Sequence, residues 1–265
     1  MDLTNSSKQK TLNIKKNKPD RDLKFVCISD THSKTDDLIL PEGDVLIHSG
    51  DFSNYGGKDC LQKFKEFFDK QKFQYKIIVA GNHDWTLSNL ERERNEKTWK
   101  RYLKGGIPSI EEAKSFLKDF IYLEDSGTDI CGLKIWGSPM SIWFAGLKDW
   151  GFTVKEEDIC KYWDLIPENT DILITHSPPG GILDTEKEDP NFGWGSPNLL
   201  KQIEERIDPS IHVFGHVHDP NGFKFDDVKN IAYVNAAICD NNYDPINKFK
   251  VFTITKEGNI TFELD

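Results

Sequence analysis

Short apolar runs recur along the chain, separated by charged and polar segments. Five of these runs are apolar at nearly every position, which is typical of strands that are covered on both faces of a sheet. They occupy residues 23–28, 45–48, 76–79, 171–174 and 211–214. A further series at residues 231–237, 250–255 and 259–264 predicts successive strands, the last two joined by a hairpin turn.

A helical pattern lies between the second and third runs. Leu61, Phe64, Phe67 and Phe68 fall on one helical face, with lysine and glutamate on the other. Strand, helix and strand in succession favour an α/β core. We therefore predict two sheets that pack face to face, with helices outside.

The organisation along the chain is that of one domain. Residues 1–22 are polar and lysine-rich, and we expect a disordered tail, with a basic docking arm as the alternative. No linker rich in proline, glycine or serine divides residues 23–265, which we assign to a single domain. Residues 86–119 form a charged, helix-prone insert, interpreted as a solvated helical segment, with a lid over the site as the alternative.

Charge and apolar content exclude some classes of partner. The 44 acidic and 34 basic residues give a net charge of −10, which disfavours general nucleic-acid binding. A phosphorylated substrate stays compatible with this charge, because bound metal ions supply local positive charge. No apolar run approaches the ~18 residues of a membrane span, so no membrane partner is expected.

The five cysteines are an odd number with no Cys-x-x-Cys pair. This pattern disfavours a disulfide framework or a zinc knuckle and favours a reducing compartment. The N-terminal segment has no apolar core of a secretory signal. We expect a cytoplasmic protein. The sequence does not indicate its oligomeric state.

Polar segments that carry Asp, Asn or His directly follow the five apolar runs. They are Asp30-Thr31-His32, Gly50-Asp51, Gly81-Asn82-His83-Asp84, Thr175-His176 and Gly215-His216-Val217-His218. Ligands of α/β sheets bind in the crevice beyond the carboxyl ends of the strands. We expect these five segments to converge there.

The side chains of these segments are metal ligands by type. Carboxylate, imidazole and amide oxygen bind hard or borderline divalent ions. They are too many for one ion and suit two ions bridged by a carboxylate. Taken alone, each segment has a structural explanation, such as a helix cap or turn for Asp-Thr-His and a core position for His176. Five such segments, each after a strand, favour the metal interpretation.

In this order, the five segments resemble the motifs of the calcineurin-like metallophosphoesterase family. Residues 47–53, 136–139, 175–179 and 234–237 further resemble its metallophosphoesterase-domain subgroup, related to class III cyclic-nucleotide phosphodiesterases. The resemblance runs from about residue 24 to the C-terminus. It implies a four-layer αββα sandwich of two mixed β-sheets with flanking helices.

The resemblance also implies roles for single residues. A first metal ion would be held by Asp30, His32, Asp51 and His218. A second ion would be held by Asp51, Asn82, His176 and His216, with Asp51 bridging the two. His83 would lie beside the phosphate, to stabilise charge or to protonate the leaving oxygen, and Asp84 would orient His83.

The implied activity is hydrolysis of phosphoesters by a hydroxide held between two divalent ions. We expect small phosphodiesters as substrates, with cyclic nucleotides among the candidates. Mixed nitrogen and oxygen ligands are compatible with manganese, iron, zinc or magnesium, and the resemblance favours manganese.

Two alternatives remain for the function. A phosphomonoesterase or protein phosphatase is disfavoured because no arginine stands next to the ligand histidines. A non-catalytic scaffold or binding module of the same fold is disfavoured because every ligand position is filled.

Aromatic residues are candidates for a substrate pocket. Trp143, Phe144 and Trp194 could form the wall for a base or an aryl group. Core packing and loop anchoring are the structural alternative, and we prefer it for the neighbouring Trp150. His48 and His212 lie within apolar strands, where a hydrogen-bonded role is favoured over metal binding.

Overall fold

The apolar runs that predict strands form the centres of two sheets. The structure is a computed structural model, which describes residues 9–90, 92–103, 105–143 and 150–264. In the first sheet β2 (Leu23–Ile28), β3 (Val45–Ser49) and β4 (Tyr75–Val79) are adjacent and parallel. In the second sheet β10 (Ile172–Thr175) and β11 (Ile211–Phe214) are parallel neighbours.

Further strands extend each sheet on both sides. In the first sheet they are β1 (Gln9–Asn13), β5 (Ile121–Leu123), β14 (Lys250–Ile254) and β15 (Asn259–Glu263). In the second sheet they are β6 (Ser126–Ile130), β7 (Leu133–Ser138), β12 (Gly222–Asp226) and β13 (Ile231–Asn235). The strand orders are β1-β15-β14-β2-β3-β4-β5 and β12-β13-β11-β10-β7-β6. Both sheets are mixed, because β14 runs antiparallel to β2 and β6 antiparallel to β7.

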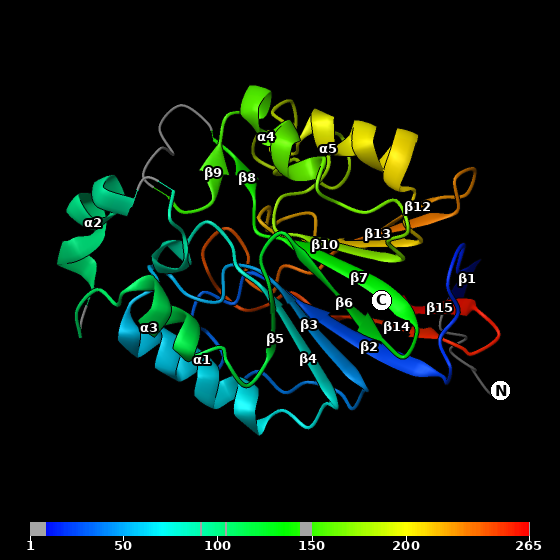
Figure 1. Ribbon diagram of the computed structural model, residues 1–265, viewed down its shortest axis with the longest axis horizontal. Helices are drawn as coiled ribbons and strands as arrows, with labels where there is room; N and C mark the ends of the chain where they lie inside the picture. The colour runs from blue at the N-terminus through cyan, green and yellow to red at the C-terminus, as the bar shows by residue number, and fades with distance from the viewer. Residues whose placement is uncertain (1–8, 91, 104, 144–149, 265) are drawn as a thin grey trace, which may run out of the picture.

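Helices cover the outer faces of the two sheets. Figure 1 shows α1 (Lys58–Lys70) and α3 (Ile110–Ser115) outside the first sheet. On the opposite side, α4 (Glu156–Trp163) and α5 (Pro197–Gln202) lie outside the second sheet. The predicted four-layer αββα sandwich is confirmed.

The alternation of side chains along each strand builds the core on both faces of each sheet. In β2, Phe25 and Cys27 join the apolar cluster between the two sheets. Val26 and Ile28 point the other way and join the cluster that contains Leu61 and Phe64 of α1. The continuous apolar character of these runs therefore reflects burial on both faces.

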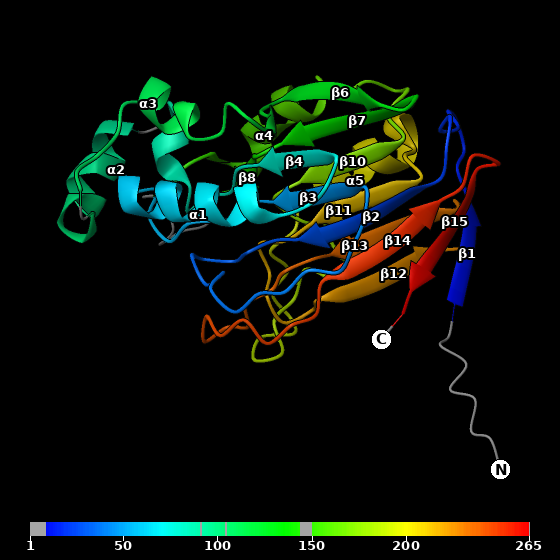
Figure 2. The ribbon, with the colours of Figure 1, turned by 90° about the horizontal axis from the view of Figure 1, so that it is seen from below.

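The predicted disordered tail is wrong for the part that the structure describes. Strand β1 pairs antiparallel with β15 along its whole length (Figure 2). Leu12 and Ile14 are buried, and the Lys15 ammonium lies 2.5 Å from a carboxylate oxygen of Asp208. Alternating apolar residues among the lysines thus give this segment a buried face. Residues 1–8 of the expected tail lie outside the described residues.

The insert of residues 86–119 is helical over its described part. It contains α2 (Arg92–Trp99), a 3₁₀ turn η2 (Lys100–Tyr102) and α3, and begins within the 3₁₀ turn η1 (Trp85–Leu87). Figure 1 shows α2 beyond the end of the sheets. A small parallel pair, β8 (Ser141–Ile142) and β9 (Thr153–Val154), follows further along the chain. Within the described ranges, no helix is both long and apolar enough to cross a membrane.

Candidate metal centre

The predicted ligand segments meet at one edge of the two sheets. The first three follow β2, β3 and β4 of the first sheet, and the last two follow β10 and β11 of the second. These strands carry their segments at their carboxyl ends, which is where α/β sheets bind ligands. Both sheets therefore contribute to a single site.

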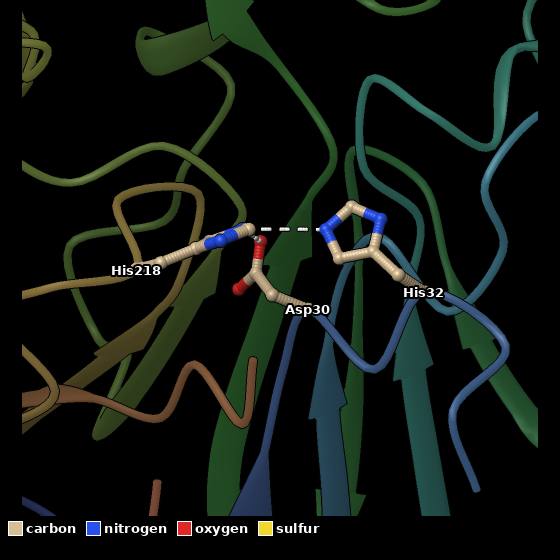
Figure 3. A group of neighbouring side chains, drawn as sticks. All are labelled: Asp30, His32 and His218. Atoms are coloured by element: carbon tan, nitrogen blue, oxygen red, sulfur yellow. Dashed lines mark hydrogen bonds and ion pairs between the residues drawn. The ribbon is translucent and has the colours of Figure 1, made fainter. Parts of the chain in front are cut away.

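A first group consists of Asp30, His32 and His218, whose ligand atoms lie within 4.8 Å of one another. His32 Nε2 is 3.2 Å from His218 Nε2, and His218 Nε2 is 3.5 Å from Asp30 Oδ1. Figure 3 shows the three side chains pointing toward one another, Asp30 and His32 from the segment after β2 and His218 from the segment after β11. Two imidazole nitrogens and a carboxylate thus converge on one small volume.

A second group consists of Asp51, His176 and His216. His176 Nε2 is 3.3 Å from Asp51 Oδ2 and 3.0 Å from the side-chain oxygen of Asn82. Asp51 Oδ2 also lies 3.9 Å from His32 Nε2. Asp51 therefore stands between the two groups, where a bridging carboxylate would be needed.

Backbone carbonyls fix the orientation of two of these imidazoles. His176 Nδ1 is 3.0 Å from the carbonyl oxygen of Ser49, and His218 Nδ1 is 2.9 Å from that of Asp240. Because a carbonyl only accepts, each Nδ1 carries a proton, and the neutral ring then offers its Nε2 lone pair to the site. This tautomer is the one that binds a metal ion through Nε2.

A buried nitrogen without a hydrogen-bond partner also indicates a metal site. His216 Nε2 is buried and has no hydrogen-bond partner among the described residues. Burial lowers the pKa of His216 to about 3, so its imidazole is neutral at physiological pH. Burial alone would raise the pKa of Asp51, but the imidazoles of His176 and His83 outweigh it and hold this pKa well below its ordinary value. Burial alone would lower the pKa of His176, but Asp51 raises it to about 9, so a bound ion would take the place of a proton on this imidazole. The ionised carboxylate and the neutral His216 imidazole fit a divalent cation directly.

The backbone at the site is strained. Asp30, His32, Asp51 and His216 all have positive φ angles, between 41° and 70°. Non-glycine residues seldom adopt this conformation, which costs free energy that the surrounding structure must compensate. Gly81 allows a close approach of the backbone, since a Cβ there would lie 2.2 Å from Asp51 Oδ1. The chain geometry is therefore adapted to bring these side chains together.

His83 lies at the same centre, but Asp84 does not orient it as predicted. The His83 backbone N–H donates to Asp51 Oδ1, and its Nδ1 is 2.9 Å from the carbonyl oxygen of Asn54. The Asp84 carboxylate instead accepts hydrogen bonds from the backbone N–H groups of Gly81 and Ser53 and from the Ser53 hydroxyl. Asp84 is fully buried beneath the loops and ties together the segments that carry Asp51 and Asn82.

A pocket of about 390 Å³ opens onto the centre. Besides five of the ligand-segment residues, its lining comprises Trp150, Glu186, Glu188, Trp194, Asn241 and Tyr243. Trp194 thus lines the pocket, as expected. Trp143 does not: its backbone N–H donates to Val154, and its side chain lines a separate hollow with Lys155 and Lys161. Phe144 lies outside the described residues.

Sequence reasoning missed Trp150 and Tyr243 as parts of this site. The Trp150 ring lies 3.8 Å from the His83 ring, centroid to centroid. Tyr243 makes edge contacts with the rings of His32 and His218, at 4.6 and 5.5 Å. Tyr243 could have been found, because its loop follows β13, another parallel strand of the second sheet. Trp150 precedes β9 and does not follow the carboxyl end of a strand in either large sheet, so it gave no comparable signal.

Two more histidines hold the strand ends in place. His48 of β3 accepts from the Gly50 N–H at Nδ1, and its Nε2 lies 3.0 Å from the Thr31 hydroxyl. His212 of β11 lies 2.8 Å from the Thr175 hydroxyl. Both imidazoles are fully buried and do not belong to the groups of possible metal ligands in the described chain.

Comparison with known proteins gives a consistent result. A family model described as calcineurin-like phosphoesterase matches residues 23–220. Metallophosphoesterase domain-containing protein 1 from Homo sapiens is 40% identical over 239 residues, covering 87% of this chain and 70% of that protein. UPF0046 protein K07C11.7 from Caenorhabditis elegans is 36% identical over 239 residues, covering 89% and 76%.

The fold is also similar to that of solved structures. A Staphylococcus aureus protein named as a candidate 5′-nucleotidase gives a TM-score of 0.51 at 13% identity, over 92% of this chain. The chain spans 53% of that structure, and the likeness concerns the fold alone. The family match carries more weight, because residues 23–220 include all five ligand segments, and so do the two relatives, because of their identity and coverage. The chain belongs to the calcineurin-like phosphoesterase family.

Proposed function

We propose that this chain hydrolyses small phosphodiesters with the help of two divalent metal ions. Membership of the family supports metal-dependent phosphoester hydrolysis in general. The observation that carries the proposal is the pair of ligand groups with Asp51 between them.

Each ion has a candidate set of ligands in the chain. Asp30, His32, Asp51 and His218 would hold the first ion, and Asp51, Asn82, His176 and His216 the second. When bound, such ions neutralise charge on phosphoryl oxygens and lower the pKa of water. Asp51 and the surrounding imidazoles fix where this positive charge lies, and the strained loops keep these groups in place before substrate binds.

His83 is the candidate catalytic side chain beside the ions. Its Nδ1 proton is directed to the Asn54 carbonyl, and its Nε2 lies 3.9 Å from Asp51 Oδ2. The imidazole lines the pocket, where it can contact a phosphoryl or leaving oxygen. With Nδ1 bonded to Asn54, stabilising charge or protonating the leaving group requires a second proton on Nε2, so we assign these two alternative roles to the His83 imidazolium.

The charge of the pocket favours diesters over monoesters. Its described lining includes Glu186 and Glu188 but no lysine or arginine. A phosphomonoester carries up to two negative charges and would gain from basic side chains, whereas a diester carries one. Trp194 lines the pocket and is an aromatic partner for a base, so cyclic nucleotides are candidate substrates.

We further propose manganese as the activating metal and the cytoplasm as the compartment. The mixed nitrogen and oxygen ligands are compatible with manganese, as with iron, zinc or magnesium. All five cysteines are free thiols, which suits a reducing compartment.

The test compares bis(p-nitrophenyl) phosphate with p-nitrophenyl phosphate, in metal-stripped protein and after Mn²⁺ is added. We expect Mn²⁺-dependent cleavage of the diester, with a higher kcat/KM than for the monoester and a loss of at least ~10²-fold in His83→Ala. A higher kcat/KM for the monoester would favour a phosphatase. The absence of turnover in protein that binds two ions would favour a scaffold or binding module.

A further inference from the structure

Aromatic side chains of the insert approach His83 through a continuous series of ring contacts. The Trp150 ring packs on His83 with centroids 3.8 Å apart and planes tilted by 32°. Trp99, the last residue of α2, packs on Trp150 with centroids 4.2 Å apart. Two ring contacts therefore connect the insert to the candidate catalytic imidazole.

The same aromatic group also contacts the loop whose backbone carbonyl accepts a hydrogen bond from His83. Tyr55 lies 5.1 Å from Trp99 and is stacked on Tyr102, with centroids 5.3 Å apart. Tyr55 directly follows Asn54, whose carbonyl oxygen lies 2.9 Å from His83 Nδ1. Trp150, which packs on the His83 ring, therefore contacts the insert. Tyr55, which follows the hydrogen-bonding residue Asn54, contacts it too.

Backbone contacts hold this arrangement close to the metal centre. Gly151 donates its N–H to the carbonyl oxygen of Asn82, which places Trp150 beside the His83 segment. A Cβ at Gly151 would lie 2.4 Å from Trp85 Cα, so this approach requires glycine. The Thr86 hydroxyl donates to the carbonyl oxygen of Gly56 and joins the start of the insert to the loop that carries Tyr55.

Packing of the sandwich does not explain this aromatic group. Trp99, Trp150 and Tyr55 are half-buried, and Tyr102 is 48% exposed. None of the four belongs to the two apolar clusters that fill the described core. The four rings form one connected group, in which Trp150 contacts His83, Trp99 contacts Trp150, and Tyr55 and Tyr102 contact Trp99.

We propose that the insert positions His83: Trp99 acts through Trp150 and through Tyr55 to fix the imidazole in the orientation used for phosphodiester cleavage. This inference rests on the proposed function of His83. Trp99 is a positioning residue, since it does not line the pocket of the metal centre. A small displacement of a catalytic group lowers the rate more than it lowers substrate binding.

A double-mutant cycle with bis(p-nitrophenyl) phosphate tests the inference. We expect Trp99→Ala to lower kcat about tenfold with little change in KM, and Trp99→Phe to restore most of the rate because it keeps an aromatic face. Lys100→Ala, an exposed neighbour in the insert, serves as the control. In the His83→Ala background, Trp99→Ala should have no further effect.

Equal effects of Trp99→Ala with and without His83 would overturn the inference, and so would a wild-type kcat in Trp99→Ala. If wild type and His83→Ala cleave the diester equally, the proposed role of His83 fails instead. Tyr55→Leu provides a second variant, because it removes the same aromatic support from the other side.

A spectroscopic readout separates positioning from activity. The His83 Hε1 proton, assigned by its absence in His83→Ala, lies within the ring current of Trp150. Trp99→Ala should shift this resonance in metal-free protein, while Lys100→Ala leaves it in place. An unchanged resonance in Trp99→Ala would overturn the inference whatever the turnover.

Discussion

At the scale of single residues, the site depends on close contacts that leave no room for added atoms. Gly81 is the clearest case, because a Cβ there would meet Asp51 Oδ1 at 2.2 Å and His176 Cε1 at 2.7 Å. Both neighbours are fixed, Asp51 by strained backbone and His176 by the Ser49 carbonyl. One methyl group must therefore displace candidate ligands of both ions.

We expect Gly81→Ala to lower metal affinity and to reduce kcat by at least ~10²-fold, while the fold is retained. Isothermal titration with Mn²⁺, diester turnover and far-UV circular dichroism would measure the three effects. Gly222→Ala is the matched control, since a Cβ there would meet its nearest neighbour, the Pro220 oxygen, at 3.7 Å. Wild-type metal affinity in Gly81→Ala would contradict the geometry described for Asp51.

The positions of the site residues, but not all of their partners, could be predicted from the sequence. Asp, Asn and His after apolar strands indicated that they would meet, because parallel strands end at one edge. The partner of His83 could not be predicted in this way. Asp84 is its neighbour in sequence, yet the contact comes from the carbonyl of Asn54, and a backbone carbonyl leaves no signature in the sequence.

At the scale of elements, one inner strand of each sheet carries a buried histidine that contacts a residue at or next to the carboxyl end of a neighbouring strand. In β3, His48 accepts from the Gly50 N–H, so it donates to the Thr31 hydroxyl from Nε2. In β11, the Thr175 hydroxyl donates to the Ser177 carbonyl, so it accepts from His212 Nε2. The His48 imidazole therefore fits its hydrogen bonds only in the neutral form. His212 Nδ1 is buried without a hydrogen-bond partner among the described residues, so burial alone keeps this imidazole neutral.

This arrangement predicts a loss of stability in acid. Burial lowers the pKa of His48 and of His212 to about 3, whereas both would titrate near 6.5 in the unfolded chain. Below about pH 6.5 the unfolded chain takes up protons that the folded protein does not. The free energy of unfolding therefore decreases as the pH is lowered. Each histidine contributes a slope of up to about 1.4 kcal/mol per pH unit between about pH 6.5 and 3.

Urea denaturation of metal-free protein at pH 7, 6 and 5 would measure this slope. His212→Asn removes one titrating group and should flatten the dependence, although the substitution itself lowers stability. An equal slope in wild type and His212→Asn would show that His212 does not remain neutral in the folded state.

The elements that sequence patterns missed share a physical cause. Strand β1 lies among lysines, and its apolar face is small, so it is stabilised by pairing with β15 rather than by its own composition. Strands β6 and β7 alternate in burial, and β5 has one buried residue among three, and all of them stand nearer to the sheet edges than the central strands. The central strands could be predicted because burial on both faces makes them continuously apolar.

At the scale of the whole molecule, the metal centre joins the two sheets. Asp30, His32, Asp51 and Asn82 come from the first sheet, and His176, His216 and His218 from the second. A bound ion that takes ligands from both would stabilise their packing, because it binds the folded protein and not the dispersed ligands of the unfolded chain. The free energy of unfolding would rise by about 2.7 kcal/mol at a metal concentration of 100 Kd per site.

The measurement that tests this account most directly is a titration of metal-stripped protein with Mn²⁺, followed in parallel by calorimetry and by diester hydrolysis. We predict two ions per chain, turnover that rises as the sites fill, and a fall of at least ~10²-fold in kcat for Asp51→Asn, with fewer ions bound. Asp69→Asn, which changes a surface ion pair with Lys65, should behave as wild type. Two bound ions and wild-type kcat in Asp51→Asn would contradict the account.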